Sequence, residues 1–342
     1  MEYREVLENA KGIEGFRCKV CPQCNGKACR GAVPGPGGKD SGDTFVRNYE
    51  KLAEIKVHLD TIYEKKSTDT SIELFGKKFR YPIFAAPIGG LAPNYGAADR
   101  MDDYLYAKAI IEGCKTAGTL GFTGDGAKDE FYSQPLQVIE ENQGWGIPTI
   151  KPWKQEEVMK KIQMAEKAGV PAIAMDIDAA GLVLLAMLGK PVSPKPVEEL
   201  KEIIGTTKTP FILKGIMTAK GAEKALEAGA YGIVVSNHGG RVLDQTPATV
   251  EVLPEIVKAV SGKMKIFIDG GIRTGLDVLK VVALGADAVL IGRPYAVAAY
   301  GAGGEGVAAY TDRIGAQLEE AMLMTGCNNL QEVSQEILYI NR

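Results

Sequence analysis

Short apolar runs and longer amphipathic segments alternate along most of this chain. Eight runs rich in Ile, Val and Phe lack the polar alternation of half-exposed strands, and they are "YPIFAAPI" (81–88), "GTLGFTG" (118–124), "IPTIKPW" (147–153), "AIAMDID" (172–178), "PFILKG" (210–215), "GIVVSNH" (232–238), "KIFIDGG" (265–271) and "AVLIGRP" (288–294). Such runs are typical of parallel strands that are covered on both faces. We therefore expect eight buried parallel strands.

The segments between these runs have the period of helices. Apolar residues recur three and four positions apart, and a glycine marks the end, in "KQEEVMKKIQMAEKAG" (154–169), "TAKGAEKALEAGA" (218–230) and "TGLDVLKVVALGA" (274–286). A strand–helix unit that recurs every 20 to 40 residues or so predicts an α/β fold of the (β/α)₈ (TIM) barrel type. A doubly wound open sheet is the alternative, and unrelated α/β segments are a third interpretation.

A cysteine-rich extension precedes the repeating units. It comprises a polar amphipathic helix, "MEYREVLENAKGIEG" (1–15), then "CKVCPQCNGKAC" (18–29), then the Gly- and Pro-rich loop "GAVPGPGGKDSG" (31–42). We divide the chain into this N-terminal segment, 1–43, and a barrel with C-terminal helices, 44–342. Residues 44–66 are expected to form a polar helix and a connector.

Composition narrows the function. Of 342 residues, 45% are apolar, which is enough for a large core, and the net charge of −3 gives no basic surface for nucleic acid. No apolar stretch approaches the roughly 20 residues that span a bilayer, and the N-terminus has no signal-peptide core. We expect a soluble cytoplasmic protein.

The ends of the predicted strands carry polar residues that a plain scaffold does not need. They are Lys151, Asp176, Asp178, Lys214, Ser236, Asn237, His238, Asp269 and Arg293. In a (β/α)₈ barrel the carboxyl ends of the strands meet at one mouth, where catalytic groups collect. His238 is one of only two histidines and would therefore point to that mouth. A structural histidine at a strand end is the alternative interpretation.

Two glycine-rich turns predict an anion site. "DGGIRTG" (269–275) and "IGRP" (291–294) each come before a helix and supply Arg273 and Arg293. Glycines let backbone N–H groups approach an anion, and a helix N-terminus favours negative charge. Phosphate groups bind here in many barrels. Glycines that only shape tight turns are the alternative.

Three stretches together carry a family resemblance. "SNHGGRVLDQTPATVEVLPEI" (236–256), "DGGIRTGLDVLKVVALGADAVLIGRP" (269–294) and "ILKGI" (212–216) resemble the FMN-dependent L-2-hydroxy acid oxidases and dehydrogenases, the family of glycolate oxidase, lactate oxidase and flavocytochrome b2. The resemblance spans about 44–325 and is strongest from 205 to 300. It implies an FMN cofactor and a homotetramer.

The resemblance also implies roles for individual residues. His238 matches the base that takes the substrate hydroxyl proton, Asp178 the aspartate that orients it, and Arg241 the arginine that grips the substrate carboxylate. The residues that match flavin contacts are Ile88, Gly89, Lys214, Ser236, Asp269, Gly271, Arg273, Gly292 and Arg293. These residue types suit the chemistry: imidazole is a base near neutral pH, lysine stabilises an anionic reduced flavin, and guanidinium forms a fork for carboxylate.

The chain departs from the family in its carboxylate clamp. The family's N-terminal tyrosine pair has no counterpart, Lys151 stands at the strand-3 tyrosine position, and the second clamp arginine is missing from "AAGLVLLAMLGKPVSPKP" (179–196). Either Lys151 supplies a second charge to bind a 2-hydroxy acid whose apolar side chain faces Leu182–Leu188, or the substrate class has changed. A mere surface lysine is the third interpretation.

Four of the six cysteines raise a separate hypothesis. Cys18, Cys21, Cys24 and Cys29 have the spacing C-x₂-C-x₂-C-x₄-C, whose first part matches the start of a bacterial ferredoxin run. An iron–sulfur cluster, a structural zinc ion, and ligand-free thiols or disulfides all stay open. A cluster would carry electrons from the reduced flavin to a protein or quinone acceptor; without one, oxygen also stays open.

The sequence as a whole predicts oxidation of a small L-2-hydroxy acid, such as lactate or glycolate, to a 2-oxo acid. The alternatives are an FMN barrel with non-redox chemistry like type 2 isopentenyl-diphosphate isomerase, and an FMN-binding protein with an altered substrate class or no turnover. Chemistry like that of inosine monophosphate dehydrogenase is disfavoured, because its cysteine nucleophile loop has no counterpart here.

Overall fold

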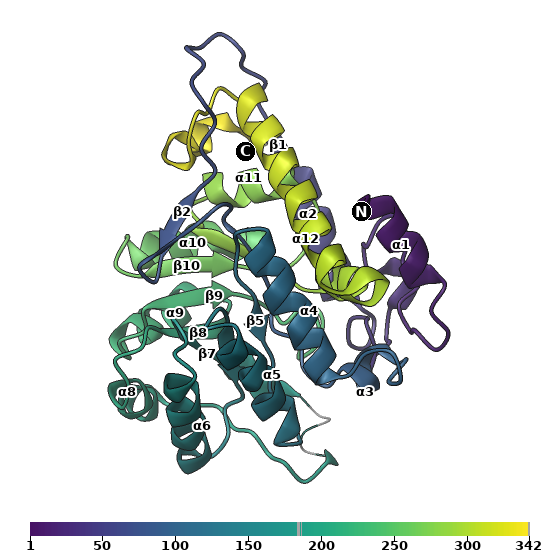
Figure 1. Ribbon diagram of the computed structural model, residues 1–342. Helices are drawn as coiled ribbons and strands as arrows, with labels where there is room; N and C mark the ends of the chain where they lie inside the picture. The colour runs from purple at the N-terminus through teal and green to yellow at the C-terminus, as the bar shows by residue number, and fades with distance from the viewer. Residues whose placement is uncertain (183–184, 186, 341–342) are drawn as a thin grey trace.

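Eight parallel strands form one sheet that closes into a ring, and Figure 1 shows part of this sheet from the side. The computed structural model describes every residue except 183–184, 186 and 341–342. The strands are β4 (Ile83–Ala85), β5 (Phe122–Thr123), β6 (Ile147–Ile150), β7 (Ile173–Asp176), β8 (Phe211–Ile216), β9 (Gly232–Val235), β10 (Lys265–Ile268) and β11 (Ala288–Ile291). Their order is β4-β11-β10-β9-β8-β7-β6-β5, and a parallel bridge between Ala85 and Gly121 joins the two ends. The predicted (β/α)₈ barrel is confirmed, and each strand lies in its predicted run, except that β8 extends one residue beyond its run to Ile216.

Helices follow the strands and cover the outside of the ring. They are α4 (Asp103–Thr116), α5 (Glu130–Glu141), α6 (Gln155–Lys167), α8 (Val197–Gly205), α9 (Ala219–Glu227), α10 (Thr249–Val260), α11 (Gly275–Ala283) and α12 (Arg293–Met324). Side-chain caps fix several starts, as where Thr218 accepts the amide of Gly221 at 2.9 Å. Helix α12 departs from helical geometry at Ala302 and Gly303 and packs along α4 (Figure 1).

Bulky side chains fill the ring, so the barrel has a packed core. Phe84, Phe122 and Phe267 are fully buried there, and the Phe267 ring lies tilted to that of Phe84 and edge-on to that of Phe122. The hairpin of β2 (Ile72–Leu74) and β3 (Lys77–Phe79) adds Leu74 and Phe79 to the same cluster. This packing leaves the carboxyl ends of the strands as the place for a ligand.

The remaining elements surround the barrel. They are α1 (Tyr3–Lys11), α2 (Asp43–Glu54), α3 (Leu91–Tyr95), the strands β1 (Lys56–Val57) and β12 (Leu338–Tyr339), and the 3₁₀ turns η1 (Lys27–Cys29), η2 (Ile177–Gly181), η3 (Leu330–Glu332) and η4 (Gln335–Ile337). Helix α1 packs on α12, with the rings of Tyr3 and Tyr310 5.1 Å apart. Strand β1 pairs with β12 in a part of the molecule that projects away from the barrel (Figure 1).

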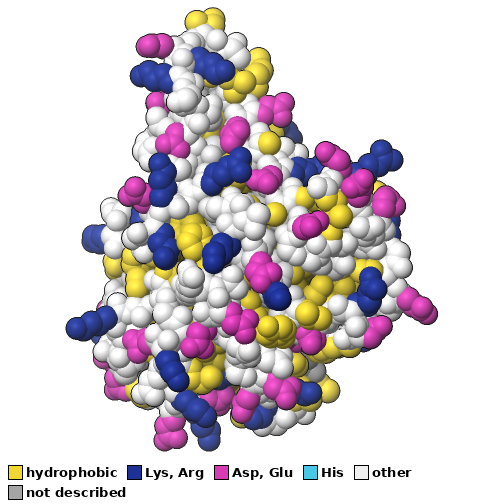
Figure 2. Space-filling view, in the orientation of Figure 1, with side chains coloured by type: hydrophobic (Ala, Val, Ile, Leu, Met, Phe, Trp, Pro, Cys, Tyr) yellow, Lys and Arg dark blue, Asp and Glu magenta, His cyan; other side chains and the backbone are white. Residues whose placement is uncertain are grey.

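Charged side chains of both signs are interspersed over the visible face (Figure 2), in keeping with the net charge of −3. Among the described residues, no helix combines the length and the hydrophobicity needed to cross a membrane.

Candidate active site

A cavity of about 830 Å³ opens at the carboxyl ends of the strands. Every strand of the ring contributes lining residues, among them Ala86–Gly90, Gly124–Ala127, Lys151, Asp176, Lys214, His238–Gly239, Asp269–Arg273 and Ile291–Arg293. Parallel strands bring their ends to one edge, which is why residues more than 200 positions apart in the sequence share this wall.

An unusual turn positions His238 after β9. His238, Gly239 and Gly240 all have positive φ, at 57°, 61° and 75°. A side chain on Gly239 would put its Cβ 2.5 Å from Nη1 of Arg293, and one on Gly240 would put its Cβ 2.8 Å from the backbone nitrogen of Phe45. The glycines of "HGG" are therefore needed for both conformation and space. The histidine itself holds a conformation that costs energy, as is typical of functional sites.

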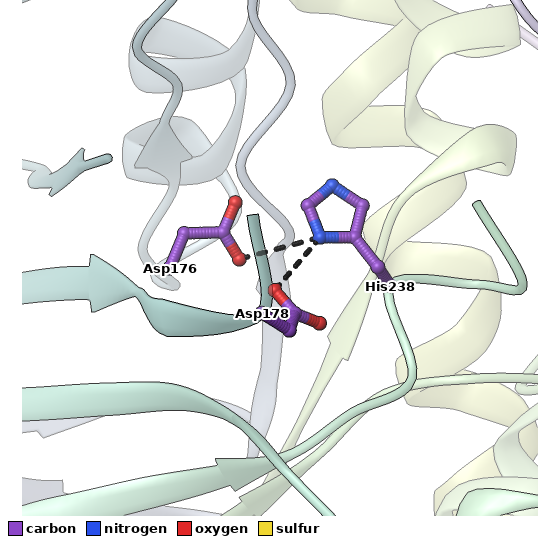
Figure 3. Close-up of side chains that lie close together, drawn as sticks. All are labelled: Asp176, Asp178 and His238. Carbon is purple, nitrogen blue, oxygen red and sulfur yellow. Dashed lines mark hydrogen bonds and ion pairs between the residues drawn. The ribbon is translucent and has the colours of Figure 1, made fainter. Parts of the chain in front are cut away.

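Two carboxylates approach one nitrogen of the imidazole (Figure 3). Nδ1 of His238 lies 2.9 Å from Oδ1 of Asp178 and 3.4 Å from Oδ1 of Asp176. Ionised carboxylates only accept hydrogen bonds, so we infer that Nδ1 carries the proton in the neutral ring. The other ring nitrogen, Nε2, points away from both carboxylates and is left as the basic atom. The predicted neighbours Asp178 and His238 thus lie together.

Asp176 is the centre of a larger charge cluster, which the sequence analysis missed. Its Oδ2 accepts the ammonium of Lys151 at 2.5 Å and its Oδ1 that of Lys214 at 3.0 Å. All three side chains are buried. Burial alone would raise the pKa of Asp176, but the charges of His238, Lys151 and Lys214 outweigh burial and hold that pKa well below its usual range.

Lys214 and Lys151 both interact with these carboxylates. Burial would lower the pKa of Lys214, yet Asp176, Asp178 and Asp269 together raise it above its ordinary value. Lys151 lines the cavity, but its ammonium is engaged by Asp176. In this arrangement Lys151 holds the cluster together, and its expected contact with a substrate carboxylate stays a prediction.

Next to this cluster, two buried polar atoms that line the cavity have no partner among the described residues. They are Oγ1 of Thr149 and Oδ1 of Asp269. The second oxygen of Asp269 accepts the hydroxyl of Ser236 at 2.8 Å, and burial raises the pKa of this carboxyl. Unpaired buried polar atoms are costly, so these two indicate a polar ligand.

Arg241, Arg273 and Arg293 lie at the mouth and donate to neutral oxygens. Arg241 donates to the carbonyl of Gly35 and, at 2.7 Å, to Oδ1 of Asn94. Burial and the charge of Arg293 lower the pKa of Arg241 to about 10.

The other two arginines bind the N-terminal segment. Arg273 Nε donates to the carbonyl of Cys24 at 2.9 Å, and Arg293 donates to those of Pro36 and Gly37 at 2.6 and 2.8 Å. None of the three mouth arginines has a carboxylate within ion-pair distance in the described part of the chain. Three uncompensated positive charges favour an anionic ligand.

A second buried network borders the cavity and was also missed. Asp125, which follows β5, accepts Trp153 Nε1 at 2.6 Å and Lys161 Nζ at 2.9 Å. Lys161 belongs to α6 and looks like a surface position in the sequence. The cue was "TGDG" (123–126), an acidic residue just after a buried run. Ile88 and Gly89 line the cavity beside this network; a Cβ on Gly89 would lie 3.0 Å from the Asp125 carbonyl oxygen.

The segment expected to face the substrate side chain is described only in part. Residues 183, 184 and 186 of the predicted Leu182–Leu188 stretch lie outside the described residues. Leu182, Leu185, Met187 and Leu188 line the cavity.

The segment with the four clustered cysteines contacts the mouth through Cys24, whose carbonyl oxygen accepts from Arg273 at 2.9 Å. All four are partly buried, and none forms a disulfide. Among the described residues, the only group of three or more potential metal ligands with all ligand atoms within 4.8 Å of one another is Asp176, Asp178 and His238. The cysteine sulfurs are therefore spread more widely than that.

A family model covers nearly all of the chain. The model described as FMN-dependent dehydrogenase matches residues 36–184 and 186–340. A peroxisomal (S)-2-hydroxyacid oxidase of Arabidopsis thaliana is 30% identical over 337 residues, which cover 87% of this chain and 89% of that protein. A 4-hydroxymandelate oxidase of Amycolatopsis orientalis is 31% identical over 336 residues, which cover 89% and 94%.

Solved structures agree with these relatives. A crystal structure of mandelate oxidase with (S)-2-phenylpropionate superposes with a TM-score of 0.80 at 26% identity, covering 99% of this chain and 97% of that one. A mandelate oxidase variant with a monooxide FMN adduct has a TM-score of 0.74 at 30% identity, covering 89% and 93%.

Proposed function

The chain belongs to the FMN-dependent dehydrogenase family, and on that premise we propose that it oxidises a small L-2-hydroxy acid to the corresponding 2-oxo acid. The observation that supports this proposal is that a histidine and an arginine with the chemistry of a base and a carboxylate-binding group line the same cavity. His238, with Nδ1 held by two aspartates, and Arg241, with no carboxylate partner among the described residues, both line the cavity.

The residues of the cavity fit FMN. Arg273 and Arg293, which lie beside glycine-rich turns, would hold its phosphate, and the unpaired oxygens of Thr149 and Asp269 are suited to polar edges of the cofactor. We propose that the set of residues that holds FMN is Ile88, Gly89, Lys214, Ser236, Asp269, Gly271, Arg273, Gly292 and Arg293. When bound, FMN accepts the two electrons that leave the substrate.

His238 acts as the base. Its Nε2 takes the proton of the substrate hydroxyl while the bond from carbon to hydrogen breaks. The buried cluster around it contains Asp176, Asp178 and Asp269 against Lys151 and Lys214, so a protonated His238 brings its formal charge to zero. The carboxylates therefore stabilise the imidazolium that the reaction forms. We assign the orienting role to Asp178 and Asp176 jointly.

We assign different roles to Lys214 and Lys151. We propose that Lys214 lies beside the flavin and favours its anionic reduced form. Lys151 keeps Asp176 ionised through the 2.5 Å contact, and any help it gives to a substrate carboxylate requires that this contact open. Arg241 is then the principal group that binds the carboxylate, through a bidentate fork.

Four further assignments stay predictions. The protein is expected to assemble as a homotetramer and to work in the cytoplasm, although the named relatives include peroxisomal enzymes. The cysteines Cys18, Cys21, Cys24 and Cys29 are expected to hold a metal or cluster. Non-redox chemistry on FMN, like that of type 2 isopentenyl-diphosphate isomerase, is the second candidate function.

Anaerobic spectroscopy tests the proposal. The FMN-loaded protein is mixed with L-lactate, glycolate and L-mandelate, with D-lactate as the matched control, and the flavin absorbance is followed. Bleaching by glycolate or by at least one L-acid, with the 2-oxo acid formed in equal amount, supports the proposal. No bleaching by any L-2-hydroxy acid across a panel of small and apolar side chains, in protein whose flavin dithionite reduces, would contradict it.

A further inference from the structure

We propose that Cys18, Cys21, Cys24 and Cys29 bind an iron–sulfur cluster at the edge of the barrel mouth. Three cysteines at C-x₂-C-x₂-C spacing wrap a cubane cluster in bacterial ferredoxins, and the fourth follows here after four residues. Cys114 and Cys327 lie elsewhere, buried in the core. The four clustered cysteines therefore form a set with its own place in the fold.

The cysteine segment is fixed to the wall of the cavity. Arg273 donates to the carbonyl oxygen of Cys24 at 2.9 Å, and the same arginine lines the cavity. Gly26 has φ of 84° and lies so close to Phe45 that a Cβ would come within 2.7 Å of the ring. The Phe45 ring in turn lies 3.7 Å from the guanidinium of Arg293. Arg273 therefore lies between this segment and the proposed phosphate end of FMN.

The four thiols lie near one another. Cys21, Cys24 and Cys29 are close enough to Cys18 for electrostatic interaction with its sulfur. All four cysteines are partly buried, and none forms a disulfide. A metal displaces the thiol proton and binds the thiolate.

The spread of the sulfur atoms favours a cluster over zinc. A zinc ion holds four sulfurs at about 2.3 Å, which puts neighbouring sulfurs only about 3.8 Å apart. In the part of the chain that the structure describes, no three of these sulfurs lie within 4.8 Å of one another. In a cubane each cysteine binds a different iron atom, so the cage of ligands is wider.

The charge of the segment suits an anionic cluster. Residues 11–30 contain Lys11, Arg17, Lys19, Lys27 and Arg30 against the single acidic residue Glu14. Four thiolates on a [4Fe–4S]²⁺ core carry a net charge of −2, which these groups compensate.

The position of the cluster beside the cavity suits electron transfer from the reduced flavin, and this step rests on the proposed function. Reoxidation of reduced flavin, FMNH⁻, to FMN releases two electrons and one proton. The cluster takes the electrons singly, cycling twice between [4Fe–4S]²⁺ and [4Fe–4S]⁺, and the proton passes to solvent. A one-electron acceptor protein of the ferredoxin class removes each electron, so that the enzyme works as a dehydrogenase.

The full-length protein, purified without oxygen and reconstituted with iron and sulfide, tests the site independently of any substrate. We expect about four iron atoms and four sulfides per chain, and a paramagnetic signal after dithionite reduction. Cys24→Ser should lose most of the iron and the signal. Cys327→Ser, which changes a cysteine outside the segment, should keep both.

Stoichiometric zinc, or no metal after reconstitution, would overturn the proposal. So would iron that binds equally to wild type and to a variant with all four cysteines changed to serine. If Cys24→Ser fails to fold, Cys21→Ser gives the same comparison, with FMN content as the measure of an intact barrel. A negative result here, together with flavin bleaching by a 2-hydroxy acid, would remove the cluster and leave the proposed function standing.

Discussion

Asp176→Asn removes the charge on which the buried cluster depends. The amide has nearly the shape of the carboxylate, so the change is mainly electrostatic. It leaves the ammonium groups of Lys151 and Lys214, at 2.5 and 3.0 Å, without their shared partner. Both lysines are buried, with 8% and 3% of their surface exposed, so water cannot replace the lost carboxylate.

The magnitude follows from burial. Breaking a buried ion pair by removing one partner costs about 3–5 kcal/mol. An unfolding entropy of about 2.1 cal/mol/K per residue gives roughly 0.7 kcal/mol/K for a chain of this length. The melting temperature should therefore fall by about 4–7 °C.

The assay is thermal unfolding at one saturating FMN concentration, because bound ligand raises the midpoint by mass action. Asp312→Asn is the matched control: Asp312 pairs with Arg80 at 2.9 Å, but both side chains are more than half exposed. An exposed pair contributes about 0–1 kcal/mol, so the melting temperature of the control should shift by about 1.5 °C or less. Equal shifts of the melting temperature in the two variants would refute the stabilising role given to the buried charge cluster around Asp176.

Two further experiments separate the effect of the lost charge at position 176 from any effect of side-chain shape. Lys151→Met in the Asp176→Asn background removes an excess cation and should recover part of the loss, as a double-mutant cycle measures. The pH dependence has a definite sign, because the native pKa of Asp176 is lowered. Its stabilisation is complete above the unfolded pKa of about 3.9 and is lost as pH falls towards the native value. The gap between wild type and Asp176→Asn should therefore close only below about pH 4.

Two further variants test the mouth of the barrel. Arg241→Lys loses the bidentate fork, so kcat/KM should fall by about 10- to 100-fold with the flavin spectrum unchanged; unaltered kinetics would remove Arg241 from the carboxylate site. Gly239→Ala puts a Cβ 2.5 Å from Nη1 of Arg293, so the Kd for FMN, measured by fluorescence titration, should rise at least about tenfold. Gly262→Ala is the control, because Gly262 has φ of 74° and nothing lies within 4 Å of the added Cβ. It introduces backbone strain without a clash, so an equal loss of FMN affinity in this variant would contradict the role given to Arg293.

The barrel could be predicted from sequence because its strands are buried on both faces. That burial demands uninterrupted apolar runs such as "GIVV", and the amphipathic helices between them repeat at a regular interval. The β2–β3 hairpin and the β1–β12 pair gave no such signal. They have only two or three residues per strand, and their pairing depends on the barrel on which they pack.

The sequence predicts where the site lies better than it predicts which side chains pair within it. Parallel strands bring their ends together, so His238 and Asp178 could be placed at one mouth from sequence. Which carboxylate binds which cation depends on side-chain conformations across the ring, so the central place of Asp176 was missed. Lys161 was missed for a related reason, since only the fold brings its helix to Asp125.

The rate of flavin reduction in His238→Asn tests the central claim most directly. The variant and the wild type, each loaded with FMN, are mixed anaerobically with the same L-2-hydroxy acid in a stopped-flow spectrometer. We predict equal FMN content and a reduction rate lower by about 10²- to 10⁴-fold in the variant, the usual contribution of a general base. Reduction of both proteins at the same rate would show that Nε2 of His238 does not take the substrate proton.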